Sequence, residues 1–404
     1  MSELTSRKRV RKALKHEIPD KMPIDFGAMR STGIHVTAYQ NLKKHLNINS
    51  PTKVYDVFQQ LAEPEEEILE LFQADVIQLS RLAPAFGIKI NDWRKWQSND
   101  GNEFLVPKGF KPIKNENGDL EIKDGEEVIA RMPQNGLYFD KVYRPLAEAS
   151  STNDIDKIDF PVIDEEELEW LEKNARRLYE DTDYAILGEF GGNIFEAGQF
   201  DFGYERYYLE LGYNSRLIKY YHDKLLEHHL YNLEKYLNVV GDYIDVIQFG
   251  DDLGMQNSSQ ISVEMYKNQI KPYHEKQYKY VRANHPDTKV FLHSCGSIYN
   301  LIPELINAGV EILNPVQISA KNMNPKELKD NFGDKLIFWG GGCDTQTTLT
   351  DGSIEEIERE TKNNINIFKE NSGYVFTQVH NIQANIDPEK ILAMYKTAIN
   401  NRNY

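Results

Sequence analysis

Short apolar segments alternate with amphipathic helical segments along most of the chain. The apolar segments are rich in Val, Ile, Phe and Tyr, and they are continuous rather than interrupted by polar residues at every second position. Continuous apolar runs are typical of parallel strands that are buried on both faces. Eight such segments occur, at residues 22–27, 74–80, 184–192, 245–254, 289–297, 310–318, 335–344 and 373–382.

Eight strands interleaved with helices predict an α/β fold, specifically a (β/α)8 TIM barrel. A doubly wound sheet is the alternative, because a count of strands does not establish closure. Residues 91–133 interrupt the alternation and predict β-hairpins, with turn sequences Asn-Asp-Gly, Glu-Asn-Gly-Asp and Lys-Asp-Gly. We therefore expect a single TIM-barrel domain over residues 1–404, with an inserted hairpin or cap region over residues 82–150, after the second strand.

Composition and charge exclude several classes of function. The net charge is −16 over 404 residues, which argues against nucleic-acid binding. No apolar run is long enough to span a membrane, the basic N-terminus lacks an apolar signal core, and two cysteines provide no disulfide framework. We expect a cytoplasmic protein. The basic residues near the start predict one solvated helix face: Arg7, Lys8, Arg9, Arg11, Lys12 and Lys15.

The segment VFLHSCGSIYN places His293 two residues before Cys295. Strand side chains alternate in direction, so both side chains point the same way at the end of a strand and can reach one ion. The other cysteine, Cys343, closes the next but one apolar segment and would lie on the same rim of a barrel. An imidazole and two thiolates suit zinc. Two buried thiols and an unrelated histidine are the alternative interpretation.

Polar side chains follow other strand segments as well. Glu189 lies in LGEFGGN, Glu196 follows it, and Asp251 and Asp252 lie in FGDDLG. Carboxylates at the barrel mouth can bind a metal, orient a ligand or transfer protons; helix capping and loop ion pairs are the alternatives. His380 ends the last segment and can be a metal ligand, a hydrogen-bond partner of one, or a general acid. We interpret most other histidines as surface residues.

Taken together, these motifs resemble the uroporphyrinogen decarboxylase superfamily. The resemblance runs in order through SRKRVRKALKHEIPDKMPIDFG, GGNIFEAGQFDFGYERYY, FGDDLGMQNSSQISVEMYK, HSCG, GGGCDTQTTLTDGSIEEIERE and GYVFTQVHNIQANIDPEKI. It implies a TIM barrel. True decarboxylases of this superfamily carry an Arg-Gln-Ala-Gly-Arg segment after the first strand, whereas this chain reads DFGAMRSTGIHVTAY, in which only Arg30 is basic.

The zinc-dependent corrinoid methyltransferases are the other branch. The resemblance to them implies Zn²⁺ held by His293, Cys295 and a third residue, and a corrinoid carried on a partner protein. The third ligand is either Cys343, which we predict, or His380, which lies near the position of the later cysteine of that branch. The resemblance also implies methyl transfer between a small methylated ether, amine or thiol and the corrinoid protein, with Glu189, Asp251 and His380 acting on the substrate.

Two other functions are compatible with the sequence. A tetrapyrrole decarboxylase would need several Arg or Lys residues at the barrel mouth and no metal. A barrel that binds a corrinoid or a partner without catalysis would not need intact zinc ligands. We expect no nucleic-acid or membrane partner, and a homodimer is compatible with the sequence.

Overall fold

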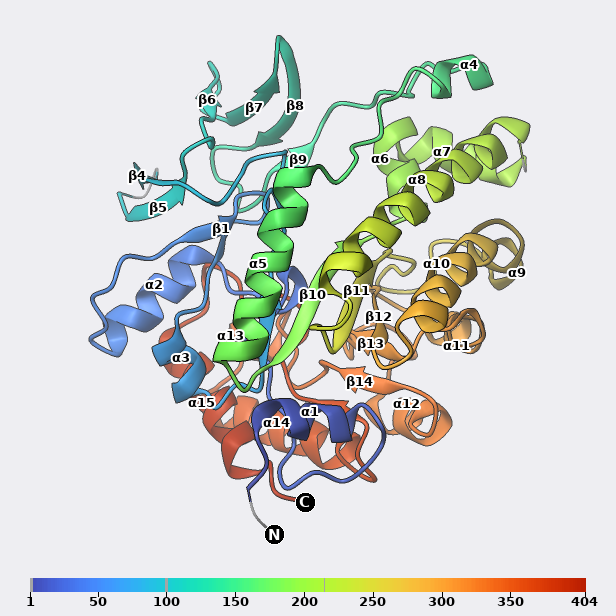
Figure 1. Cartoon of the computed structure of the whole chain (residues 1–404). Coiled ribbons are helices and arrows are strands. Elements are labelled where there is room, and N and C mark those ends of the chain that lie inside the picture. Colours follow the sequence, from blue (N-terminus) through green and yellow to red (C-terminus); the bar gives the residue numbers. More distant parts are fainter. Residues whose placement is uncertain (1–2, 99–100, 214) are drawn as a thin grey trace.

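The computed structural model describes residues 3–98, 101–213 and 215–404. Its centre is a curled parallel sheet of seven strands, in the order β15-β14-β13-β12-β11-β10-β3 (Figure 1). The strands are β3 (Val76–Leu79), β10 (Ala185–Gly191), β11 (Val246–Gly250), β12 (Lys289–His293), β13 (Ile312–Asn314), β14 (Ile337–Trp339) and β15 (Tyr374–Val375). Each lies within one of the predicted apolar segments, and all neighbours are parallel.

The first predicted strand segment, residues 22–27, bridges the two edges of this sheet instead of forming a full strand. Asp75 N–H donates to the Ile24 carbonyl over 2.7 Å on the β3 side, and Phe376 N–H donates to the Pro23 carbonyl over 2.9 Å on the β15 side. An isolated parallel bridge joins Ile24 to Phe376. The sheet is therefore barrel-like. It has seven assigned strands, and residues 22–27, which were predicted as the first strand, form a short segment that connects its two edges.

Helices follow the strands and cover the outside of the sheet (Figure 1). The longest, α8 (Arg216–Val240), begins at Ser215, whose hydroxyl accepts the Ile218 N–H, and α14 (Ile354–Phe368) begins with a Ser353–Glu356 capping box. The others are α1 (Ser6–Ala13), α2 (Val36–His45), α3 (Glu66–Leu71), α4 (Thr152–Ile155), α5 (Glu165–Asp181), α6 (Phe195–Phe202), α7 (Tyr204–Gly212), α9 (Val263–Met265), α10 (Lys271–Asn284), α11 (Ile302–Ala308), α12 (Pro325–Phe332), α13 (Thr348–Asp351) and α15 (Pro388–Asn400), with short 3-10 turns at Arg30–Thr32 and Tyr299–Leu301 and a π-helix at Tyr266–Ile270.

Small antiparallel sheets lie between β3 and β10, where the hairpin insertion was expected. Strand β4 (Trp93–Gln97) pairs with β5 (Glu103–Pro107); β6 (Ile113–Lys114), β7 (Leu120–Asp124), β8 (Glu127–Met132) and β9 (Asp140–Lys141) form a second sheet. A further pair, β1 (Val54–Asp56) and β2 (Leu61–Ala62), precedes β3. The Lys-Asp-Gly turn joins β7 to β8 as predicted, whereas residues 99–100 of the Asn-Asp-Gly turn lie outside the described residues.

The basic residues near the start, in and just after α1, form the predicted solvated face only in part: Lys8, Arg11 and Lys15 are exposed, whereas Arg9 is buried. Val10 and Leu14 pack into the barrel interior, so the helix lies across its N-terminal end. Arg7 donates to four backbone carbonyls between residues 178 and 184, and Arg9 binds Asp75 with an Nη1–Oδ1 distance of 2.6 Å. The contacts of Arg7 and Arg9 were not predicted, because the periodicity of charge does not show which carbonyls and carboxylates meet a helix after folding. Among the described residues, no helix combines the length and the apolarity that a membrane span requires.

Candidate metal centre and active site

Three side chains converge at the C-terminal mouth of the barrel. His293 ends β12, Cys295 follows it, and His380 lies beyond β15; one donor atom of each lies within 4.8 Å of the others. Cys295 Sγ is 3.4 Å from His293 Nε2, and the centres of the His293 and His380 rings are 5.4 Å apart. His293 and Cys295 therefore lie together as predicted. Two imidazoles and one thiolate form a donor set that fits zinc and leaves a fourth position open.

The backbone around His380 holds its side chain in place. His380 has φ = +61°, in the left-handed region that non-glycine residues seldom adopt. The flanking Val379 N–H donates to the Cys343 carbonyl over 2.9 Å, and the Asn381 side chain bonds to Gly33 N–H and Gln59. Residues held in such conformations often occur at functional sites. Burial and the neighbouring His293 lower the pKa of His380, so its imidazole is neutral and available to a metal.

Asn314, at the end of β13, orients His293. Its Oδ1 lies 2.7 Å from His293 Nδ1, and its Nδ2 donates to the Trp339 carbonyl over 2.8 Å, which fixes the direction of the amide. Nδ1 of the neutral imidazole must then carry the proton, so Nε2 presents its lone pair to the metal position. Such partners of metal-binding histidines commonly control both ring orientation and affinity.

Replacing Asn314 with alanine is therefore expected to lower the zinc affinity about 10- to 100-fold, because His293 loses the group that fixes its tautomer. Competition for zinc against a coloured chelator measures this change. Asn331→Ala, which removes an exposed hydrogen bond to Tyr299, is the matched control. Equal affinities for the two variants would contradict the role given to Asn314.

The structure does not place Cys343 with the other donors, which corrects the prediction of the third ligand. Cys343 follows Gly340, Gly341 and Gly342, of which the first two have positive φ. These residues turn the chain after β14, so the thiol is fully buried and its Sγ lies 3.9 Å from the Asp344 carbonyl. The strand-end position was predicted correctly, but the direction of the side chain depends on a turn that spacing alone does not reveal.

His293 and His380 line a cavity of about 610 Å³ between the barrel mouth and the inserted segment. Its aromatic wall contains five phenylalanines: Phe58, Phe86, Phe160, Phe190 and Phe200. Four carboxylates and two cations also line it: Glu189, Glu196, Asp201, Asp252, Arg30 and Lys141. A cavity of this size, with an apolar wall and a few polar groups, suits a small molecule.

Glu189 lies on this wall as expected. Gln78 donates to its carboxylate over 3.1 Å, and Arg30 Nη2 lies 3.7 Å from it. Arg30 is also paired with Asp56 and donates to the Pro84 carbonyl. Burial raises the pKa of Glu189, and the nearby Arg30 opposes this shift. These contacts hold the Glu189 carboxylate at a fixed position facing the cavity.

Glu196 and Asp252 form a second acidic pair, close to the three donors. Asp252 Oδ1 accepts the Cys295 N–H over 2.7 Å and lies 3.6 Å from His293 Nε2. Asn193 donates to Glu196 over 2.7 Å. Burial raises the pKa of Glu196, and the negative charges of Asp252 and Asp251 raise it further. Burial, Asp252 and Glu196 also raise the pKa of the Cys295 thiol, so a bound cation would relieve strong local repulsion.

Asp251, which was predicted to act on the substrate, lies instead behind the wall and is fully buried. Its carboxylate accepts the backbone N–H groups of residues 194, 195 and 196 over 3.2, 2.8 and 2.7 Å, and it lies 2.8 Å from His274 Nε2. A carboxylate at the start of α6 is stabilised by the unpaired N–H groups there. Asp251 thus positions the segment that carries Glu196.

Several residues that line the cavity carry no signal in the sequence. His228 and His229 were interpreted as surface residues, but both line the cavity from α8. Lys141, in the insertion, was not singled out at all. A histidine pair at the middle of a long amphipathic helix carries no signal for which face will meet the barrel mouth, so packing alone reveals this contribution.

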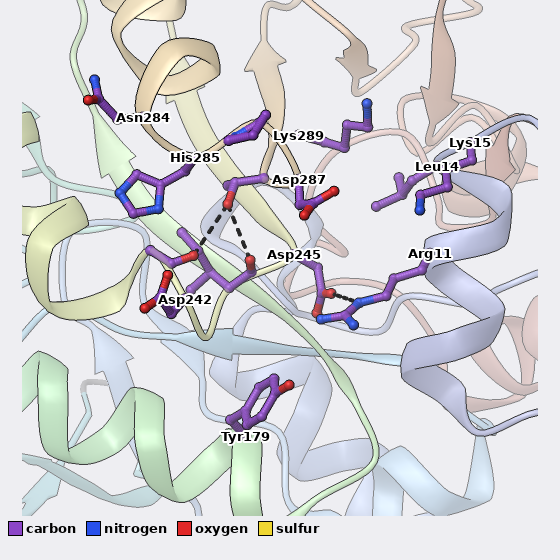
Figure 2. A pocket seen from close by; sticks show the side chains of 14 residues that line it. Arg11, Leu14, Lys15, Tyr179, Asp242, Asp245, Asn284, His285, Asp287 and Lys289 are labelled. Carbon is purple, nitrogen blue, oxygen red and sulfur yellow. Dashed lines mark hydrogen bonds and ion pairs between the residues drawn. The ribbon is translucent and has the colours of Figure 1, made fainter.

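A second cavity of about 410 Å³ lies at the opposite, N-terminal end of the barrel. Figure 2 shows Arg11 of α1 reaching Asp245, which precedes β11, and their atoms form an ion pair. Asp245 also accepts the Ile186 N–H over 2.9 Å. These contacts join α1 to two strands. Polar groups at this end of a barrel generally stabilise the fold, whereas sites form at the other end.

The overall fold is shared with a methyltransferase from Methanosarcina mazei. That structure has a TM-score of 0.59 and 16% sequence identity, and the match covers 98% of this chain and 99% of that chain. A glycoside hydrolase family 5 enzyme from Prevotella bryantii B14 scores 0.34 at 11% identity, over 58% of this chain and 77% of its own. An alpha-amylase from Lactobacillus plantarum has a TM-score of 0.32 and 11% identity, and the match covers 58% of this chain and 62% of that chain. The last two scores are too low to support an inference.

The model of the uroporphyrinogen decarboxylase (URO-D) family matches residues 214–400. This match includes His293, Cys295 and His380. Over these residues the match agrees with the resemblance to the uroporphyrinogen decarboxylase superfamily that the motifs indicated. Among curated proteins no significant match was found.

Proposed function

We propose that this protein is a zinc-dependent methyltransferase, which moves a methyl group between a small methylated ether, amine or thiol and a corrinoid carried by a partner protein. The observation that carries the proposal is the convergence of His293, Cys295 and His380 at the mouth of the barrel. Similarity in fold to a methyltransferase supports it.

The charges of the cavity favour this function over tetrapyrrole decarboxylation. A polycarboxylate substrate requires a cationic surface, but four carboxylates and only two cations line this cavity. One of the two cations, Arg30, is already paired with Asp56 and lies near Glu189. Among the described residues, the lining of the cavity therefore lacks the set of free arginines and lysines that binding of a decarboxylase substrate would need.

The residues of the chain have distinct tasks in the proposed reaction. His293 Nε2, Cys295 Sγ and a nitrogen of His380 would hold zinc, while Asn314 maintains the orientation of His293. Zinc would supply Lewis acidity, either to polarise an ether or amine or to keep a thiolate nucleophilic. Glu189 faces the same cavity and orients the substrate. The phenylalanine wall excludes water from the reacting groups.

Glu196 is placed to hold the proton that methyl transfer requires. Its carboxyl lies on the cavity wall, and burial raises its pKa. The protonated form can donate to the oxygen or nitrogen atom that loses its methyl group, and the ionised form can accept the proton of a thiol. This assignment replaces Asp251, which lies behind the wall.

Free cobalamin provides the test. We expect the zinc-loaded protein to catalyse one of two reactions. In the first, cob(I)alamin takes a methyl group from one member of a panel of methyl ethers and methylamines; in the second, methylcobalamin gives its methyl group to a thiol. Visible absorbance follows both reactions. His293→Ala should abolish the conversion. Zinc-independent conversion of uroporphyrinogen to coproporphyrinogen, followed by chromatography, would refute the proposal and support the decarboxylase.

A further inference from the structure

Asp25 is a buried carboxylate inside the barrel that the proposed reaction does not use. It lies in the segment that connects the two edges of the sheet, and it is fully buried. Its Oδ2 accepts the Trp339 indole N–H over 2.8 Å, and its Oδ1 accepts the Ala28 N–H over 2.8 Å. Burial raises the pKa of Asp25 to about 6, and the hydrogen bonds from Trp339, Ala28 and Thr32 oppose this shift. The carboxylate is therefore ionised at neutral pH, and both oxygens act as acceptors.

Asp25 forms no ion pair with any described residue. The side chains of Trp339 and Ala28 belong to the apolar interior of the barrel. Burying an ionised carboxylate beside apolar groups without a cation costs free energy, and filling the interior would not require it. We therefore looked for what the two hydrogen bonds of Asp25 hold in place.

Two routes lead from Asp25 to Asn314, the residue that orients His293. The first runs through Trp339, whose indole bonds to Asp25 and whose carbonyl accepts the Asn314 Nδ2–H over 2.8 Å. Trp339 is fully buried, and Phe291 packs against it in a T-shaped contact, with ring centres 5.6 Å apart. Because the hydrogen bond and this contact fix the indole, the Trp339 carbonyl has little freedom to move.

The second route runs through the turn that Asp25 begins. Its Oδ1 accepts the N–H three residues later, which fixes the start of the segment that carries Ser31. Ser31 is buried, and its hydroxyl donates to Asn314 Oδ1 over 2.9 Å. The same oxygen lies 2.7 Å from His293 Nδ1. Asp25 thus supports one partner of each polar atom of the Asn314 amide.

We propose that Asp25 is a positioning residue of the metal centre. Through the two routes to Asn314, it holds His293 in the tautomer that carries the proton on Nδ1. A reversed Asn314 amide would present an N–H donor to Nδ1, and the proton would then lie on Nε2, the atom that faces the metal position. The inference rests on the proposed function only for the metal itself, because the tautomer is a property of the metal-free protein as well.

Nitrogen NMR of metal-free protein labelled with 15N-histidine tests the tautomer, because a ring nitrogen with a proton and one without differ in chemical shift. His293→Gln identifies the signals of His293. In the wild-type protein we expect the proton on Nδ1. Asp25→Asn replaces one carboxylate oxygen with an NH2 group, so one of its two donors loses an acceptor, and we expect a mixture of both tautomers. Should this variant not fold, Trp339→Phe tests the first route and Ser31→Ala the second.

Chelator competition measures the effect on the metal. Asp25→Asn should lower the zinc affinity about tenfold, because part of the protein then has a protonated Nε2. Trp339→Phe keeps an aromatic ring but removes the indole N–H, so it should also weaken zinc binding. The loss in the double variant should be smaller than the product of the two single losses, since both substitutions act on the same hydrogen bond.

Asp245→Asn is the matched control. Asp245 is also buried and accepts a backbone N–H, from Ile186, but it lies at the opposite end of the barrel. This variant should be less stable to urea and yet keep the wild-type tautomer and zinc affinity. The proposal is overturned if Asp25→Asn keeps the wild-type tautomer, or if Asp245→Asn changes it equally. If the wild-type protein bound no zinc while its tautomer depended on Asp25, the metal centre would be refuted and the positioning role supported.

Discussion

Replacing Cys295 with serine is expected to lower the zinc affinity at least about 100-fold and to abolish methyl transfer. A hydroxyl is a much poorer ligand than a thiolate, and Cys295 is the sole sulfur donor in the cluster. Burial and two nearby carboxylates raise the pKa of this thiol, so its proton must leave when the metal binds. The wild-type affinity should therefore fall as the pH is lowered.

Cys343→Ser is the matched control for Cys295→Ser, because both variants remove one thiol of the two that the chain contains. Its side chain points away from the cluster, so zinc stoichiometry and affinity should equal those of the wild type. Metal analysis after dialysis and chelator competition measure both variants. If Cys343→Ser lost zinc and Cys295→Ser retained it, Cys343 and not Cys295 would be the sulfur ligand.

Replacing Asp251 with alanine is expected to lower the free energy of unfolding by about 3–5 kcal/mol. Three backbone N–H groups at the start of α6 would lose their acceptor, and His274 would lose the carboxylate that lies 2.8 Å from its Nε2. Urea denaturation of the metal-free protein measures the loss. Asp330→Ala, which removes an exposed pairing with Lys326, should cost less than about 0.5 kcal/mol.

Asp251→Asn separates a positioning role from a catalytic one. The amide keeps the shape and one acceptor oxygen, so this variant should be less destabilised than Asp251→Ala and should retain methyl transfer in proportion to the folded fraction. Full stability together with complete loss of methyl transfer would show that Asp251 acts on the substrate after all.

The sequence predicted the barrel-like architecture because seven strands are continuous apolar runs that end in polar residues. It predicted the pairing of His293 with Cys295 because alternation along a strand is fixed by backbone geometry. The direction of the Cys343 side chain was missed, since three glycines precede it and turns of this kind have many conformations. The position of Lys141 on the cavity wall was missed because the packing of the insertion on the barrel mouth is a long-range contact.

The central claim is that His293, Cys295 and His380 hold one zinc ion, and zinc K-edge X-ray absorption of the zinc-loaded protein tests it most directly. The account predicts one equivalent of zinc with one sulfur neighbour, at about 2.3 Å, and nitrogen or oxygen neighbours at about 2.0–2.1 Å. Two sulfur neighbours would restore Cys343 as a ligand, and failure to bind zinc stoichiometrically would contradict the metal centre itself.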